Sequence, residues 1–177
     1  MTDIFLEREY DPPMSGPENI LELLAASSGC LDMHRVEWHG SCLSNDGGKL
    51  LCWYRAPDME STRVAMRQLG VDLSNLWNGT VHDAPGVGEK DIAAANVLVE
   101  RRFDQSMPLQ KIQDIENAGI GCLESRNVRF IRTFFSADQK RMICLYAAPD
   151  AESVRQAQRE AGVPFEEAWT FRAVDPE

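Results

Sequence analysis

The sequence lacks an apolar run of the roughly 20 residues that a membrane-spanning helix needs. Basic residues are scarce, since 18 Lys and Arg stand against 28 Asp and Glu and leave a net charge of −10. Nucleic-acid-binding surfaces are basic, so neither nucleic acid nor a membrane is expected as a partner. The 177 residues, 44% of them hydrophobic and 26% charged, have the composition of an ordinary globular protein.

Cysteines are few and form no familiar motif. The five cysteines are widely spaced, and no Cys-x-x-Cys pair indicates a common zinc or redox site. Residues 1–11 carry acids where a secretory signal has basic residues and an apolar core. Reduced thiols and a cytoplasmic location are therefore expected. The chain also lacks a Walker-type phosphate loop and a recurring Ser/His/Asp set.

An internal repeat is present instead. Residues 29–82 align without gaps on residues 121–174, at an offset of 92, and 19 of the 54 pairs are identical. Upstream, Glu7-Arg8 recurs as Glu100-Arg101 at an offset of 93. The repeat predicts two domains, residues 1–84 and 96–177, joined by a Pro/Gly/charged linker at residues 85–95. The clearest block is Cys52-Trp53-Tyr54-Arg55-Ala56-Pro57-Asp58 against Cys144-Leu145-Tyr146-Ala147-Ala148-Pro149-Asp150.

Each repeat predicts the order strand, helix, strand, strand, helix, strand. Apolar runs indicate strands, helical spacing indicates helices, and Asn, Asp and Gly indicate a tight turn between the middle strands. In the first repeat the expected elements are strand 4–10, helix 17–29, strands 36–44 and 50–56, a helix capped by Asp58 that ends at Gly70, and strand 76–82. In the second they are strand 97–103, helix 109–118, strands 128–136 and 141–147, helix 151–161 and strand 168–174.

This order is the ferredoxin-like arrangement, in which helices cover one face of an antiparallel sheet. Residues 50–54 and 142–146 are continuously apolar, which is typical of strands covered on both faces. We therefore expect an α+β protein: two tandem ferredoxin-like repeats packed sheet-to-sheet as an intramolecular pseudo-dimer, like a dimeric α/β barrel. A repeat of about 85 residues buries little surface alone, which favours such packing. A homodimer of the whole chain is left open.

Each half resembles a family of small ferredoxin-like domains of unknown function that a nickel-binding protein typifies. The resemblance covers nearly the whole chain, twice, and implies a sheet-to-sheet assembly with nickel or another divalent transition metal as cofactor. Two residues after the helix arginine, this chain has Ala65 and Ala157 where many members have histidine. The matching residues are Glu7-Arg8 and Glu100-Arg101, Ser44 with Asp46, Ser136 with Asp138, the Cys-x-Tyr-x-Ala-Pro-Asp runs from Cys52 and Cys144, and Arg63 and Arg155 with Gly70 and Gly162.

The repeated Glu-Arg pairs are the first candidates for a ligand site. Neighbouring strand residues point to opposite faces, so in a sheet covered on both faces one residue of each pair is buried and needs a polar partner. The first and third strands are neighbours, which makes the strand tyrosines the expected partners. The alternative is a structural network that fixes strand register. The candidate ligand-binding set is a polar cluster in a cavity between the sheets: Glu7, Arg8, Tyr54, Glu100, Arg101 and Tyr146.

A metal site is the second candidate. All three histidines lie in the first repeat, and Cys30, His34, His39 and Cys42 fall within 13 residues. Their spacing is not a usual zinc pattern. His39, on a strand between the sheets, and Glu7 are the candidate metal ligands. The histidines and the excess of acids also predict that a site lies in the first repeat.

Three functions compete at this point. The leading hypothesis is a cytoplasmic protein that binds a small ligand or a metal ion between its two sheets. The first alternative is a cofactor-independent enzyme of the dimeric α/β-barrel type, like monooxygenases or cyclases, which requires a cavity of at least ~300 Å³. The second alternative is a structural or regulatory interaction module, which predicts a filled core and a large exposed apolar patch.

Overall fold

The computed structural model of the chain describes residues 1–176, and its architecture is mixed α+β. The chain divides into two compact units. The first holds residues 1–79 and the segment that begins at Arg172, and the second holds residues 80–171. Strands β4 (Leu76–Asp83) and β8 (Glu167–Val174) each begin in one unit and end in the other. Within residues 1–176, no helix has the length and apolar character needed to cross a membrane.

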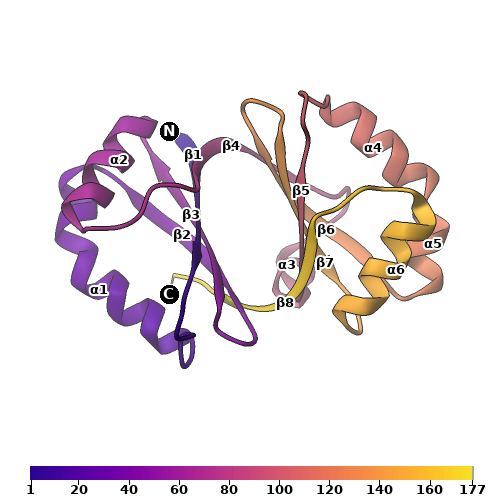
Figure 1. The fold of residues 1–177 in the computed structure, drawn as a ribbon, viewed down its shortest axis with the longest axis horizontal. Helices are drawn as coiled ribbons and strands as arrows, with labels where there is room; N and C mark the ends of the chain where they lie inside the picture. Colours follow the sequence, from indigo (N-terminus) through magenta and orange to yellow (C-terminus); the bar gives the residue numbers. More distant parts are fainter. Residues whose placement is uncertain (177) are drawn as a thin grey trace. The chain divides into compact units, whose positions relative to one another are not determined.

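The first unit contains an antiparallel sheet with its two helices on one face (Figure 1). Its elements are β1 (Thr2–Glu9), α1 (Pro17–Met33), β2 (Glu37–Ser44), β3 (Lys49–Ala56), α2 (Met59–Gln68) and the first part of β4. Strand β1 pairs with both β3 and β4, and β3 pairs with β2. The strand order is therefore β4-β1-β3-β2, which places the first and third strands side by side, as the sequence predicts.

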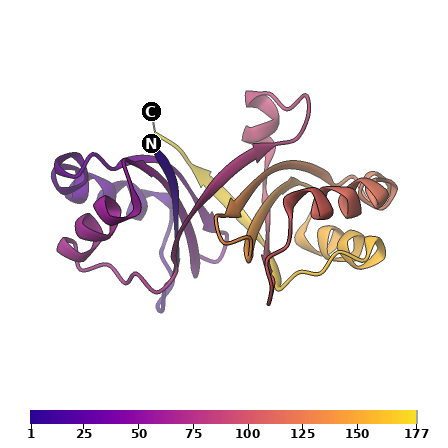
Figure 2. The ribbon, with the colours of Figure 1, turned by 90° about the horizontal axis from the view of Figure 1, so that it is seen from above.

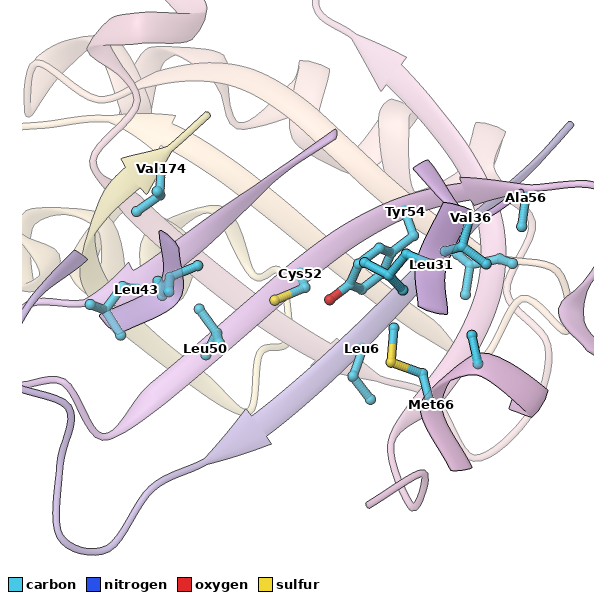
Figure 3. Close-up of a cluster of buried hydrophobic side chains, with 13 residues drawn as sticks. Leu6, Leu31, Val36, Leu43, Leu50, Cys52, Tyr54, Ala56, Met66 and Val174 are labelled. Carbon is cyan, nitrogen blue, oxygen red and sulfur yellow. The ribbon is translucent and has the colours of Figure 1, made fainter. Parts of the chain in front are cut away.

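The core of the first unit lies between this sheet and its helices. Side chains two residues apart on a strand share a face. Leu50, Cys52 and Tyr54 of β3 therefore point together into a buried cluster that also contains Met66 of α2 (Figure 3). The Tyr54 hydroxyl is directed toward the Cys52 sulfur in this view (Figure 3). Burying a large apolar side chain contributes roughly 1.5–3 kcal/mol, so this cluster holds the helices on the sheet.

The second unit has the same strand order, β8-β5-β7-β6, again with antiparallel pairs. Its elements are the end of β4, α3 (Glu89–Ala94), β5 (Val97–Arg102), α4 (Leu109–Ala118), α5 (Ile120–Ser125), β6 (Arg129–Ser136), β7 (Arg141–Ala147), α6 (Ala151–Ala161) and most of β8. Helices α4, α5 and α6 lie on one face of the sheet (Figure 1). Figure 2 shows α3 apart from these three helices.

Local details of the first unit recur 92 positions later in the second. Asp58 and Asp150 each cap the helix that follows, because a carboxylate oxygen accepts the backbone N–H of Ser61 at 2.7 Å and of Ser153 at 2.6 Å. The units therefore share strand order and the local chemistry of their caps and turns. Three further details recur: a register shift in the second strand (Trp38/Gly40 and Phe130/Arg132), a Ser–Asp hydrogen bond at the hairpin (Ser44–Asp46 and Ser136–Asp138), and a left-handed residue before that strand (Arg35 and Asn127).

Most elements lie where the sequence predicts them, and three features differ. The predicted helix end at Gly29 is wrong, because α1 continues to Met33 and Gly29 takes no special backbone conformation. Residues 85–95, predicted as a linker, contain the short helix α3. A further helix, α5, follows α4 directly at Gly119. A Cβ at Gly119 would lie 2.5 Å from the Cβ of Ala161, so α6 passes too close for a larger residue there.

Candidate functional site

A buried arginine organises the polar centre of the second unit. Arg101 of β5 is 1% exposed. Its Nη2 donates to Oε1 of Gln158 on α6 at 2.6 Å and to the Tyr146 hydroxyl on β7 at 3.1 Å, and its Nη1 donates to the Pro164 carbonyl at 2.7 Å. Its Nε is buried without a hydrogen-bond partner. The guanidinium therefore ties β5 to β7 and to α6 and the segment after it.

Glu116 of α4 supplies the opposite charge. Its Oε1 lies 3.5 Å from Nη2 of Arg101 and accepts a hydrogen bond of 3.1 Å from the Tyr146 hydroxyl. Burial raises the pKa of Glu116 above its usual value, although the charge of Arg101 acts in the other direction. Burial also raises the pKa of Tyr146 well above its usual value, so its hydroxyl stays protonated at neutral pH. The cluster therefore pairs a guanidinium with a carboxylate across a neutral tyrosine.

Cys144 and Thr133 extend this cluster along the sheet. Cys144 stands two residues before Tyr146 on β7, is fully buried, and has its sulfur 2.8 Å from the Thr133 hydroxyl on β6. Burial raises the pKa of the Cys144 thiol, which keeps it protonated at neutral pH. Because the thiolate is the nucleophilic form of cysteine, Cys144 acts here as a packing and hydrogen-bonding group.

A pocket of about 840 Å³ opens beside the cluster, lined only by residues between His82 and Met142 and therefore by the second unit alone. Small-molecule sites have volumes of roughly 300–1,000 Å³ and combine apolar walls with a few polar groups. The polar groups of this lining include the neutral amide of Gln113 on α4. Apolar residues of the lining come from the helices, from the sheet side and from the segment after β4: Leu109, Ile112, Ile120, Leu123, Val128, Phe130, Met142, Ala84, Pro85 and Val87.

Glu116 and Thr133 belong both to the cluster and to the pocket lining. The Glu116 side chain is 13% exposed, whereas that of Arg101 is fully buried. Arg101 and Tyr146 are not among the described residues that line the pocket, and they lie behind Glu116. The pocket wall therefore presents a carboxylate and a hydroxyl that buried partners hold in place.

The corresponding place in the first unit is apolar. Ile20 of α1 and Ile112 of α4 are both buried at equivalent helix positions. This correspondence sets Leu24 at the position of Glu116, and the repeat sets Met66 at the position of Gln158. The two polar partners of Arg101 that come from helices are thus absent from the first unit.

Other side chains of the first unit also make different contacts from their counterparts in the second unit. Arg8, the counterpart of Arg101, lies with its guanidinium 5.0 Å from the centre of the Tyr10 ring. Trp38, the counterpart of Phe130, donates at 3.0 Å to the hydroxyl of Ser41, the counterpart of Thr133. The sequence predicted a site in the first repeat, whereas the pocket described above lies in the second unit.

The two strand glutamates of the predicted cluster lie elsewhere. Glu7 accepts a hydrogen bond of 2.8 Å from the indole of Trp77, and Glu100 accepts one of 3.1 Å from the indole of Trp169. Each glutamate precedes its arginine on a strand, so the two side chains of a pair point to opposite faces of the sheet. The glutamates therefore anchor tryptophans of the neighbouring strand.

The structure brings together one predicted pair, Arg101 and Tyr146, and separates Glu100 from it. It also places this pair on the face that the helices cover, whereas the sequence placed it between the sheets. Sequence reasoning missed Glu116 and Gln158. Both are polar where the first repeat has an apolar residue, so a comparison of the repeats for such replacements would have found them.

The predicted metal ligands lie apart from this cluster. His39 has its ring centre 5.1 Å from that of Trp53 and its Nε2 3.6 Å from a carboxylate oxygen of Glu37. Within residues 1–176, no three His, Cys, Asp or Glu side chains are grouped so that they could hold a metal ion. Metal binding by His39 and Glu7 stays a prediction.

Comparison with known proteins connects the second unit with one family. The family model of SCO4226-like nickel responsive proteins matches residues 98–170. The crystal structure of SCO4226 from Streptomyces coelicolor A3(2) is 20% identical, and the match covers 42% of this chain and 91% of that chain with a TM-score of 0.38. Among curated proteins, no sequence matches this chain.

Longer matches come from solved structures of low identity. An arginine-to-alanine variant of chlorite dismutase from Candidatus Nitrospira defluvii is 12% identical over 99% of this chain and 90% of that chain, with a TM-score of 0.51. A heme-binding protein from Thermus thermophilus is 8% identical over 98% and 91% of the two chains, with a TM-score of 0.46. The likeness to the chlorite dismutase is one of fold and agrees with the predicted α+β class.

Proposed function

We propose that the protein binds a small molecule in the pocket of its second unit. The observation that carries the proposal is the position of Glu116. This residue meets the buried Arg101–Tyr146 pair on one side and lines a largely apolar pocket of about 840 Å³ on the other. A pocket with apolar walls and a few polar groups of shifted pKa is the usual form of a ligand site.

The first unit supports this proposal because it has the same strand order without the polar set. A buried ion pair is often no more stabilising than well-packed apolar side chains of similar volume. The first unit keeps the same strand order with Leu24 and Met66 at the positions of Glu116 and Gln158. The fold therefore does not require the polar set, and ligand binding gives a reason for its presence in the second unit.

The finer predictions remain proposals. The recurring caps, turns and register shifts support descent of both units from one ferredoxin-like repeat. The description of the matching family as nickel responsive supports nickel, or another divalent metal, as a second candidate ligand. The sheet-to-sheet packing, a site between the sheets, a cofactor-independent enzyme, a homodimer and a cytoplasmic location stay predictions.

Calorimetric titration with 2-naphthol, a small neutral aromatic probe, tests the proposed function. The proposal predicts saturable binding with one site per chain. The variant Asn117→Trp places an indole on the pocket lining from an exposed position of α4 and is expected to abolish binding. The matched control is Ala25→Trp, at the equivalent exposed position of α1, which is expected to bind like the unmodified protein. Equal binding by both variants would contradict the proposal.

A further inference from the structure

The polar wall of the pocket offers a hydrogen-bond acceptor. Oε1 of Glu116 faces Arg101 and accepts from Tyr146. Within residues 1–176, Nε of Arg101 is a buried side-chain atom that has no hydrogen-bond partner. Oε2 of Glu116 is not an atom of this kind. Since Glu116 lines the pocket and its Oε1 is already engaged by Arg101 and Tyr146, Oε2 is the oxygen left to accept from a bound molecule.

The charges around the pocket disfavour an anion. Glu116 and Glu124 both belong to the lining and are acidic. Arg129 of the lining forms an ion pair with Asp91, and Asp83 of the lining is paired with Arg132 at 2.5 Å. The remaining titratable group of the lining is His82, whose Nε2 lies 2.7 Å from the Thr80 hydroxyl.

A cation is disfavoured for a different reason. The carboxylate of Glu116 is already balanced by Arg101, whose Nη2 lies 3.5 Å away and whose side chain is fully buried. A second positive charge at Oε2 would therefore meet the field of this guanidinium at short range. A neutral donor gains the hydrogen bond without that repulsion.

Resting on the proposed function, we infer that the pocket takes a neutral, largely apolar molecule that donates one hydrogen bond, from a hydroxyl or an N–H group, to Glu116. Ile112, Leu123 and Phe130 contact the apolar body, and the donor group meets the carboxylate. A molecule without the donor leaves the acceptor desolvated and unpaired, which weakens its binding.

A set of probes with one ring system tests this inference. The set is 2-naphthol, its methyl ether, 2-naphthoate and 2-naphthylmethylammonium. Hydrogen bonds to charged groups are worth about a 10- to 100-fold difference in affinity, so 2-naphthol is expected to bind the unmodified protein more tightly than the methyl ether by that factor. The carboxylate and ammonium probes are expected to bind more weakly than 2-naphthol.

Glu116→Gln removes the charged acceptor and is expected to reduce the preference for 2-naphthol over the methyl ether. Asp114→Asn, which neutralises an exposed acid of the same helix outside the lining, is the matched control and is expected to keep the preference. The ranking in the unmodified protein needs no variant and tests the inference even where Glu116→Gln fails to fold. Equal affinities of 2-naphthol and its methyl ether would overturn the donor inference and leave the proposed function standing. Absence of binding by every probe would overturn the proposed function.

Discussion

One pair of residues shows how neighbours decide the role of a side chain. Arg8 and Arg101 occupy equivalent strand positions, yet Arg101 is 1% exposed while Arg8 is half-buried beside an aromatic ring. Glu116 and Gln158 supply the partners that allow Arg101 to be buried. A buried charge is tolerated only where it is paired and hydrogen-bonded, so the helix residues determine where the arginine lies.

The substitution Arg101→Met is expected to lower the free energy of unfolding by about 3–5 kcal/mol, because it leaves Glu116 buried without its partner. The matched substitution Arg8→Met removes a cation–π contact and is expected to cost about 1 kcal/mol or less. Urea denaturation of both variants measures the difference. Equal costs would contradict the role given to the Arg101 cluster.

The sequence predicted that one residue of the Glu100-Arg101 pair meets Tyr146, because the order of the repeat places them on neighbouring strands, but strand alternation alone did not select Arg101. It did not allow Glu116 to be assigned to the cluster. That contact depends on which face of α4 meets the sheet, and packing of the whole helix decides this.

The two hairpins show how one turn is built from different residues. Gly47 and Gln139 occupy equivalent positions with positive φ angles of 77° and 61°. The carbonyl of Gly47 accepts the backbone N–H of Met14, and that of Gln139 accepts the backbone N–H of Met107, each at 2.9 Å. A Cβ at Gly47 would lie 2.1 Å from the carbonyl oxygen of Met14, so this turn admits only glycine.

Gly47→Ala is therefore expected to destabilise the protein by about 1–3 kcal/mol, through backbone strain and the clash with Met14. Gln139→Ala is the control, because residue 139 already carries a Cβ at a positive φ, and its cost is expected to be smaller. Thermal unfolding of the two variants gives the comparison. A larger cost for the control would show that the close approach at Met14 is not what constrains this turn.

Most strands and the longer helices were predictable, whereas the two shortest helices were not. Helix α6 matches its predicted bounds because its apolar spacing extends over several turns, and strand β7 matches because a continuous apolar run marks it. Helices α3 and α5 have six residues each, which is too few to display a period. Pro and Gly near α3 also favoured a linker, and its contacts with the rest of the unit are not visible in the sequence.

At the scale of the molecule, two units with the same strand order have different interiors. The first fills the place beside its sheet with Leu24, Met66 and Trp38, and the second has a polar cluster and a pocket there. The numbers of histidines and acids predicted a site in the first repeat, because such counts include residues anywhere on the surface. The proposed site depends instead on single replacements inside the fold.

Methyl NMR of methionine-labelled protein during titration with 2-naphthol tests directly whether the ligand binds in the pocket of the second unit. Met142 belongs to the pocket lining, and Met66 lies in the core of the first unit. We predict a saturable shift of the Met142 methyl signal, with the Met66 signal unchanged. A saturable shift at Met66 with none at Met142, or no shift at either methyl group, would contradict this prediction.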